Sequence, residues 1–312
     1  MNTLESAVAD FLLSCRADGL SPATSEWYAR MLRPMVRRWP EASIDRIDVG
    51  ELRQYVVDLR ARGKRYVGAA QRPELDGGLS VESVRGHLRA MRRLFGWYWR
   101  ENDLPPASNP MLRIRMPRRR QAEPKAIDLM DLRKLIECCG DDQVGKRNRA
   151  LLLFLADTGA RAGGVMGLTW SNVMIERGRA VVTEKGDRAR VVPFTEYTGA
   201  ALTDWRAVCP DKAEFVFCSL GTTAPGRRMS MSGLAQLLER LAKKAGVTGR
   251  VNPHSFRHGF AREYLANGCD LGTLSQLMGH SDVSVTVASY AVFRDSELAV
   301  LHEKFSPVRG LK

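Results

Sequence analysis

The sequence predicts two domains of different fold class. The first is an all-α amino-terminal domain of four helices, and the second is a mostly helical α+β domain with a small antiparallel sheet. The chain has 312 residues, which is too long for a single hydrophobic core of typical size and is about the length expected for two domains. Apolar residues recur at helical spacing through the first hundred positions, whereas two valine-rich segments around a turn lie in the second half.

Four helices are expected in the first hundred residues because each start carries a capping signal. Thr3 and Ser21 are the expected N-caps of the first two helices. Asp48 and Glu51 form a capping-box pattern that starts the third helix. A loop rich in glycine and proline near residues 68–79 then precedes the fourth helix, "SVESVRGHLRAMRRLFGWYWREN".

The fourth helix combines an apolar stripe with an arginine-rich face. The stripe consists of Val84, Leu88, Met91, Leu94 and Phe95. The arginines off this stripe are Arg85, Arg89, Arg92 and Arg93. Such a face is often only solvated surface, but the excess of arginine over acidic residues favours contact with DNA.

A basic linker is expected at residues 106–125, between a first domain at 1–105 and a second at 126–312. The stretch "PPASNPMLRIRMPRRRQAEPKA" holds five prolines, which exclude a continuous helix, so the linker is expected to be extended. Its arginines are Arg113, Arg115, Arg118, Arg119 and Arg120. An ordinary hydrophilic linker and a strap along a DNA backbone both fit this composition.

The second domain is expected to contain six helices and one hairpin. The helical patterns cover residues 128–139, 145–159, 197–208, 232–246, 252–268 and 270–280. The hairpin is "RAVVTEKGDRARVVPF", with a turn at residues 185–187.

The composition restricts the class of protein. Lys and Arg number 48 against 35 Asp and Glu, a net charge of +13 that favours a polyanionic partner such as nucleic acid. The six cysteines form no CxxC pair, so we expect neither a zinc ribbon nor a disulfide framework. No signal peptide and no apolar run long enough for a membrane span is found, so a soluble cytoplasmic protein is expected.

The stretch "HSFRH" allows a metal site, an anion site or a solvated helix start. His254 and His258 have the spacing of the HExxH zinc motif, but Ser255 stands where that motif has its glutamate, and Arg257 would repel a dication. An anion site fits better, because a helix amino terminus and an arginine fork both favour phosphate. His254 would share that face and could transfer a proton.

Four other side chains are candidates for chemistry, although each also has an ordinary explanation. Arg161 follows Thr158-Gly159 at a break between two helices, and Lys185 lies at the hairpin tip. His280 ends a helix, and Tyr290 follows it. Taken singly, they could be a surface arginine, a turn lysine, a capping histidine and a packed tyrosine.

Taken in order, these residues resemble the tyrosine recombinase (phage integrase) family. The blocks "ADTGAR…GLTWSNV", "EKGDRARVVP", "HSFRHGFA" and "LMGHSDVSVT…Y" are similar to its motifs, and the resemblance covers nearly the whole chain. It implies that the first domain is a four-helix, SAM-like core-binding domain. It also implies the simple two-domain type, without an arm-binding domain.

The chain departs from the family pattern at two positions. Gly164 stands three residues after Arg161, where the family usually has an acidic residue. Tyr290 follows His280 by ten residues, one more than usual, and no other tyrosine lies downstream.

The resemblance implies site-specific DNA recombination without metal, nucleotide or other cofactor. Tyr290 would attack a DNA phosphodiester and form a 3′-phosphotyrosine. Arg161, Arg257 and His280 would bind the phosphate, while His254 and Lys185 would handle the protons. Recombination would proceed through a Holliday junction on double-stranded recombination sites. A type IB topoisomerase and a catalytically silent DNA-binding relative remain as alternatives.

The resemblance also implies a homotetramer in the synaptic complex, in which a second recombinase could take part. The apolar residues Leu298, Leu301 and Phe305 recur on one face of a short helix after Tyr290. This helix could fold back on its own domain, or it could dock on a neighbouring protomer as the family resemblance implies.

Overall fold

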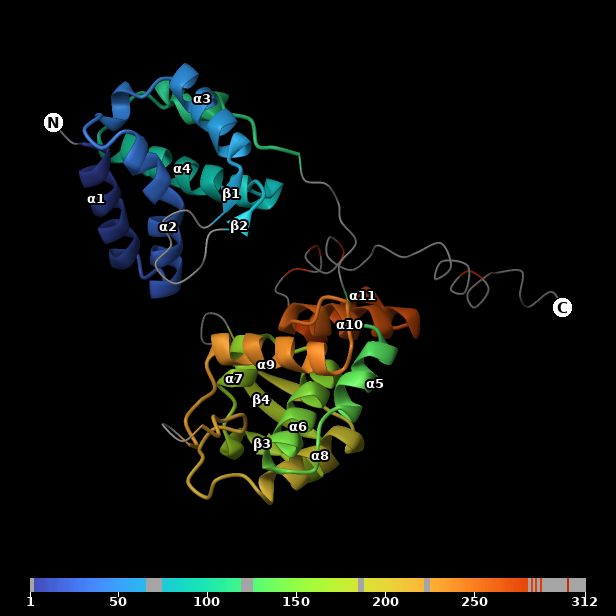
Figure 1. Cartoon of the computed structure of the whole chain (residues 1–312). Helices are drawn as coiled ribbons and strands as arrows, with labels where there is room; N and C mark the ends of the chain where they lie inside the picture. The colour runs from blue at the N-terminus through green and yellow to red at the C-terminus, as the bar shows by residue number, and fades with distance from the viewer. Residues whose placement is uncertain are drawn as a thin grey trace, which may run out of the picture. The chain divides into compact units, whose positions relative to one another are not determined.

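The computed structural model describes residues 3–65, 75–118, 126–184, 188–221 and 225–279, with four isolated positions beyond them (282, 284, 287 and 302). The chain divides into two compact units, Met1–Gln121 and Ala122–Lys312 (Figure 1). The first unit is built mainly from helices, and the second combines helices with a small antiparallel sheet. This confirms the expected fold class.

In the part of the first unit that the structure describes there are four long helices, as predicted. They are α1 (Leu4–Ala17), α2 (Pro22–Arg38), α3 (Val49–Ala61) and α4 (Val81–Glu101), with a short 3-10 turn η1 (Ile44–Arg46) between α2 and α3. As expected of N-caps, the Thr3 side chain accepts from the backbone N–H of Ser6 and the Ser21 side chain from that of Thr24. Asp48 forms a complete capping box with Glu51. The predicted apolar stripe of α4 is buried in the core of this unit.

Two local features of this unit were not predicted. A two-residue strand β1 (Lys64–Arg65) pairs antiparallel with β2 (Leu75–Asp76), which lies within the loop expected near residues 68–79. Pro34 lies inside α2, where it removes one helical N–H donor. The helix continues past it because Leu32 and Met35 on either side are fully buried.

The prediction of an extended linker is wrong for its first part. Two 3-10 turns, η2 (Pro106–Ser108) and η3 (Pro110–Arg113), occupy residues that were expected to be extended. Met111 and Ile114 are 2% and 4% exposed in the core of the first unit. Proline is compatible with the first position of a helical turn, and burial of these two apolar side chains stabilises η3 against that core.

The described residues of the second unit form the six predicted helices and one short additional helix, α7. The helices are α5 (Leu129–Glu137), α6 (Gln143–Thr158), α7 (Ala162–Met166), α8 (Glu196–Arg206), α9 (Met231–Lys244), α10 (Pro253–Ala266) and α11 (Leu271–Met278). Two further 3-10 turns, η4 (Trp170–Asn172) and η5 (Ile175–Arg177), flank the first strand. Among the helices that the structure describes, none is both long and apolar enough to cross a membrane.

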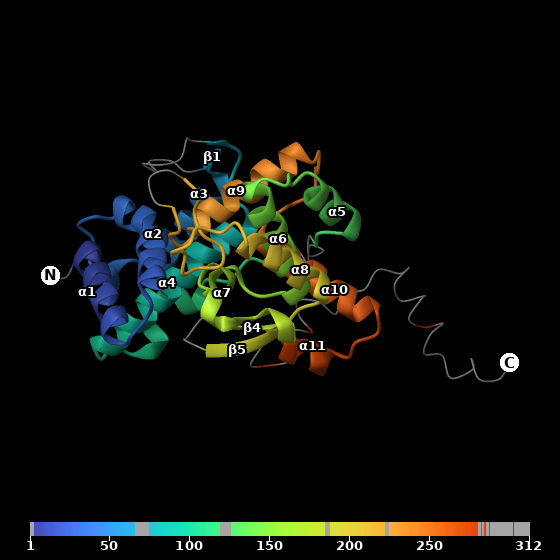
Figure 2. The same cartoon turned by 90° about the horizontal axis from the view of Figure 1, so that it is seen from below.

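Among the described residues of this unit, three antiparallel strands form a sheet in the order β3-β4-β5, and Figure 2 shows β4 and β5 side by side. They are β3 (Val173–Met174), β4 (Arg179–Glu184) and β5 (Arg188–Pro193). The predicted hairpin corresponds to β4 and β5, and Val181 pairs with Val191 across it. The strand β3 was not predicted, because two residues are too short to show an alternating pattern.

Helix α6 lies at the centre of the second unit and packs against α5, α8 and α10. Its apolar residues are buried around almost the whole circumference, as expected for a helix enclosed by others. The core continues through Trp205 of α8, which is fully buried and donates its indole N–H to the carbonyl oxygen of Val216. This packing holds the carboxyl end of α6 in place, and the candidate site begins there.

Candidate active site

The turn between α6 and α7 has one backbone conformation that its surroundings impose. Gly159 has a φ of 55°, the left-handed region that favours glycine. A Cβ atom at this position would lie 2.5 Å from Cδ1 of Phe260 on α10, so a side chain does not fit either. The chain then reaches Arg161, the N-cap residue of α7. As predicted, Arg161 therefore lies at a break between two helices.

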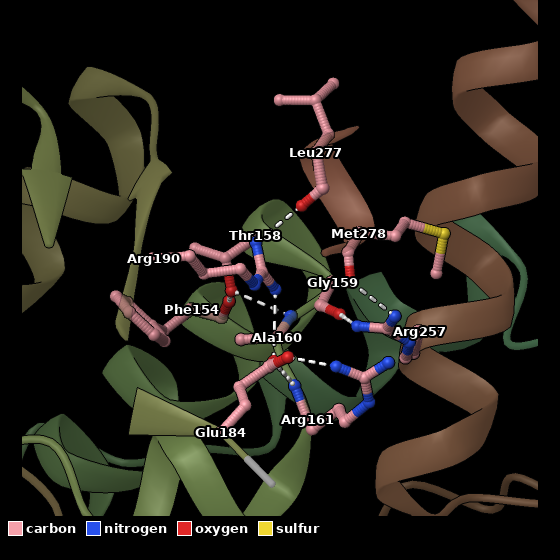
Figure 3. A network of polar contacts seen from close by, with 10 residues as sticks. All are labelled: Phe154, Thr158, Gly159, Ala160, Arg161, Glu184, Arg190, Arg257, Leu277 and Met278. Carbon is pink, nitrogen blue, oxygen red and sulfur yellow. Dashed lines mark hydrogen bonds and ion pairs between the residues drawn. The ribbon is translucent and has the colours of Figure 1, made fainter. Parts of the chain in front are cut away.

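Arg161 is paired with a carboxylate that the sequence analysis did not single out. Its backbone N–H donates to Oε1 of Glu184 at 3.0 Å, and its guanidinium donates from Nη1 to Oε2 of the same residue (Figure 3). The Arg161 side chain keeps 37% of its surface exposed, whereas that of Glu184 keeps 4%. Arg161 is thus held on one side by a buried partner and remains accessible from outside.

The alternation of residues along β4 was the available signal for Glu184. Val182 and Glu184 lie on the same face of the strand, and Val182 is fully buried. A glutamate on that face must find partners for its charge. Burial by itself raises the pKa of the Glu184 carboxyl. The hydrogen bond from the Arg161 backbone and the pairing with Arg190 and Arg161 lower this pKa by more than burial raises it, so the net shift is downward.

Arg257 is buried on α10 and connects two other segments. It donates from Nη1 to the carbonyl oxygen of Gly159 at 2.6 Å and from Nη2 to that of Met278 at 2.7 Å (Figure 3). Its residue is only 5% exposed. Because Gly159 lies two positions before Arg161, this contact holds the two predicted phosphate-binding arginines at the same turn.

The amino terminus of α10 is capped by Asn252. Asn252 accepts from the backbone N–H of Ser255, whose hydroxyl accepts in return from the Asn252 N–H. His254 lies in the first turn and is exposed, while His258 is half-buried one turn later. Burial lowers the pKa of His258, and the neighbouring His254 and Arg257 lower it further, so all three effects favour the neutral imidazole.

Arg190 of β5 joins the hairpin to the end of α11. It donates from Nη2 to Oε1 of Glu184 at 3.2 Å and from Nη1 to the carbonyl oxygen of Leu277. A Cβ atom at Gly279 would lie 2.7 Å from Cδ of Arg190 and 3.5 Å from Oε2 of Glu184. The end of the hairpin strand and the end of α11 are therefore in direct contact.

Three of the predicted site residues, Lys185, His280 and Tyr290, lie outside the described residues. Two of them directly follow the contact just described, since Lys185 comes after Glu184 and His280 after Gly279 in the sequence. The described structure brings together Arg161 and Arg257, with His254 one turn before Arg257 on the same helix.

In the parts of the chain that the structure describes, no three His, Cys, Asp or Glu side chains are grouped as metal ligands would be. The HxxxH pattern itself has one exposed and one half-buried histidine. Between them in the chain lies a buried arginine that donates to two carbonyl groups. This arrangement resembles an anion site more than a cation site.

The arginines predicted to bind DNA on α4 fall into two groups. Arg85 and Arg92 donate to the backbone carbonyl groups of Pro117 and Ile114, so they hold the start of the linker on the helix. The other two are Arg89 and Arg93; both are exposed, as is Arg92, whereas Arg85 is half-buried. In the linker Arg113, Arg115 and Arg118 are exposed as well, while Arg119 and Arg120 lie outside the described residues.

Comparison with known proteins identifies the family. Residues 125–297 match the sequence profile described as the Phage integrase family, and this segment is more than half of the chain. The chain belongs to the phage integrase family. This integrase-family chain is thus a tyrosine-type site-specific DNA recombinase, as the sequence resemblance predicted.

Curated relatives of this integrase-family chain are recombinases. It is 30% identical to tyrosine recombinase XerC of Xylella fastidiosa (strain 9a5c) over 230 residues, which cover 73% of this chain and 74% of the relative. It is 27% identical to tyrosine recombinase XerD of Listeria innocua over 238 residues, which cover 74% and 78%. These matches favour a recombinase over a type IB topoisomerase or a silent DNA-binding relative.

Solved structures show the same fold. The Tn1549 transposon integrase in complex with a circular intermediate DNA has a TM-score of 0.73 at 17% identity, covering 98% of this chain and 100% of that one. The XerH recombinase bound to a palindromic difH substrate has a TM-score of 0.69 at 20% identity, covering 97% and 85%.

Proposed function

We propose that this recombinase cuts and rejoins DNA at specific sites through a covalent 3′-phosphotyrosyl intermediate on Tyr290. The contact between Arg257 and the carbonyl oxygen of Gly159 carries the proposal, because it holds Arg161 and Arg257 at one turn. Two arginines held together by buried partners suit the two non-bridging oxygens of one phosphodiester.

The proposed reaction is a transesterification. The phenolic oxygen of Tyr290 attacks phosphorus in line, a tyrosyl–phosphate bond forms, and the bond from phosphorus to the 5′-oxygen breaks. Arg161 and Arg257 offset the charge that develops on the transition state. His280 donates a hydrogen bond to the same phosphate.

Two further side chains transfer the protons in this scheme. His254, exposed in the first turn of α10, accepts the tyrosine proton, and Lys185 donates a proton to the leaving 5′-oxygen. The protein–DNA ester conserves the energy of the phosphodiester, so religation to a second strand needs no ATP, and two such exchanges pass through a Holliday junction. No metal ion or cofactor takes part in any of these steps.

We assign the parts of the chain as follows. Residues 1–105 are a core-binding DNA-binding domain, 106–125 a basic linker, and 126–312 the catalytic domain. The exposed Arg89, Arg93, Arg113, Arg115 and Arg118 support this assignment, since exposed arginines neutralise phosphate charges and release counterions. Arg85 and Arg92 would act mainly by holding the linker where these arginines face the duplex. With DNA as substrate, the protein would work in the cytoplasm, associated with the nucleoid.

The central test is covalent trapping of DNA. The native chain is incubated with fragmented genomic DNA, and protein–DNA adducts are recovered under denaturing conditions and sequenced to identify the site. Tyr290→Phe should bind the recovered site equally well but form no adduct, because it lacks only the attacking oxygen. A phosphotyrosyl adduct formed by that variant would show that the nucleophile is another residue.

We further propose a homotetramer on two aligned recombination sites. The support is the sequence repeat of Leu298, Leu301 and Phe305, which needs an apolar partner surface; these three residues lie outside the described residues. Truncation after Pro307 should be tolerated. Truncation after Ser296 should keep binding to a single site but abolish synapsis and recombination in gel-shift and recombination assays. Full recombination by the shorter chain would exclude docking by this segment.

A further inference from the structure

Glu184 connects three segments of the candidate site through one buried carboxylate. It accepts from the backbone N–H of Arg161, from the Arg161 guanidinium and from the Arg190 guanidinium (Figure 3). Arg190 in turn donates to the carbonyl oxygen of Leu277 near the end of α11. The turn before α7, the hairpin and the end of α11 therefore meet at Glu184.

Gly164 lies against Glu184, so that any side chain at this position would be in tight contact with the glutamate. Gly164 is buried in α7, which packs on β4. A Cβ atom at position 164 would lie 3.3 Å from Cγ of Glu184 and 3.2 Å from the carbonyl oxygen of Thr183. A side chain from position 164 would thus enter the volume that the Glu184 side chain fills. A carboxylate beside Arg161 can therefore come from position 164 or from position 184, but not from both at once.

The charges around Glu184 make it more than a space-filling residue. A carboxylate that is 4% exposed is stable only when its charge is matched, and here two guanidinium groups and one backbone N–H match it. An uncharged isostere would fill the same volume but would weaken the hold on both arginines. Arg161 has 37% of its side chain exposed, so without this partner it would sample other rotamers.

We propose that Glu184 is the positioning residue of the catalytic site, that it orients Arg161 and Arg190 in place of an acidic residue on α7, and that Gly164 is required to make room for it. This inference rests on the proposed function, because the orientation of Arg161 matters for phosphate binding. It also explains why Arg161 does not need an acidic residue at position 164, where the family resemblance leads one to expect one.

The test moves the carboxylate from one position to the other. Four variants are compared with the native chain: Glu184→Gln, Glu184→Gly, Gly164→Asp, and the double variant Gly164→Asp/Glu184→Gly. The exposed Glu176→Gln is the matched control for loss of a glutamate charge in the same unit. The rate of adduct formation on a nicked duplex carrying the trapped site and the affinity for that duplex are both measured.

Glu184→Gln should cleave about tenfold to a hundredfold more slowly, the scale on which loss of an orienting partner acts, with unchanged affinity for the duplex. Gly164→Asp alone should also be slow because it crowds Glu184. The double variant should recover most of the lost rate, which a space-filling role would not predict. A native rate for Glu184→Gln, or a double variant slower than both single variants, would overturn the proposal.

A second measurement does not depend on DNA cleavage. In ¹⁵N spectra of the free protein, the guanidinium signal of Arg161, assigned with Arg161→Lys, should show restricted rotation. Glu184→Gln should abolish this restriction and the double variant should restore it. If the native protein forms no adduct, the proposed function fails, yet this spectrum still tells whether Glu184 orients Arg161. An unrestricted signal in the native protein would refute the positioning role.

Discussion

Replacement of Arg257 by lysine separates the charge of this residue from its geometry. The planar guanidinium reaches two carbonyl groups at once, Gly159 at 2.6 Å and Met278 at 2.7 Å. A lysine ammonium is a single point and can serve one of them at a time. Loss of one hydrogen bond that involves a charged donor costs about 1.5–3 kcal/mol, so Arg257→Lys should lower the free energy of unfolding by about that amount.

The same substitution should slow cleavage further than this loss of stability explains. Loss of a phosphate-binding donor typically lowers the rate by about a hundredfold or more, which corresponds to about 2.7 kcal/mol of the activation free energy. Adduct formation on the nicked duplex is therefore measured well below the unfolding midpoint, where both proteins are folded. We expect the rate per folded molecule to fall by about a hundredfold.

Arg147→Lys is the matched control. Arg147 is 7% exposed, close to the 5% of Arg257, and it also donates to a backbone carbonyl group, that of Cys218. It lies on α6 twelve residues before Gly159, about 18 Å along the helix axis at 1.5 Å per residue. The control should lose stability but cleave at the native rate. Equal cleavage by the two lysine variants would refute the catalytic reasoning for Arg257.

Three further outcomes are expected. Gly159→Ala should lower the free energy of unfolding by at least about 1–2 kcal/mol because of its left-handed backbone alone, and it should slow cleavage because the added Cβ atom would lie 2.5 Å from Phe260. The control is Gly163→Ala, where no atom lies within 4 Å of the added Cβ. Equal unfolding curves for the two variants would contradict the prediction. Met111→Ala should destabilise the first unit by about 2–5 kcal/mol in denaturant unfolding. Leu112→Ala, at a residue that is 69% exposed, should have little effect. Similar losses of stability in the two variants would mean that the linker turn is not part of the core. Cleavage should persist in excess EDTA, and loss of activity that a divalent ion restores would revive the HxxxH interpretation.

The sequence by itself determined every described α-helix except the five-residue α7, because the boundaries of the longer helices depend on local chemistry. The side chains of Thr3 and Ser21 and the capping box of Asp48 act within one turn of their own helix, so their positions can be read from residue order. Ordered motif blocks likewise led to the family, which the profile match confirmed. The strands β1 to β3 were missed because two residues show no periodicity.

Only the tertiary structure decided how the site is held together. Arg161 and Glu184 are 23 residues apart in the sequence, and Arg257 reaches a carbonyl group 98 residues away. The linker turn shows the same limit, since its prolines suggested an extended chain, whereas the 3-10 turn η3 is packed into the core through the buried Met111 and the adjoining Ile114. Residue order specifies bonds within a helical turn, but pairing between distant segments depends on which buried groups must satisfy one another after the chain has packed.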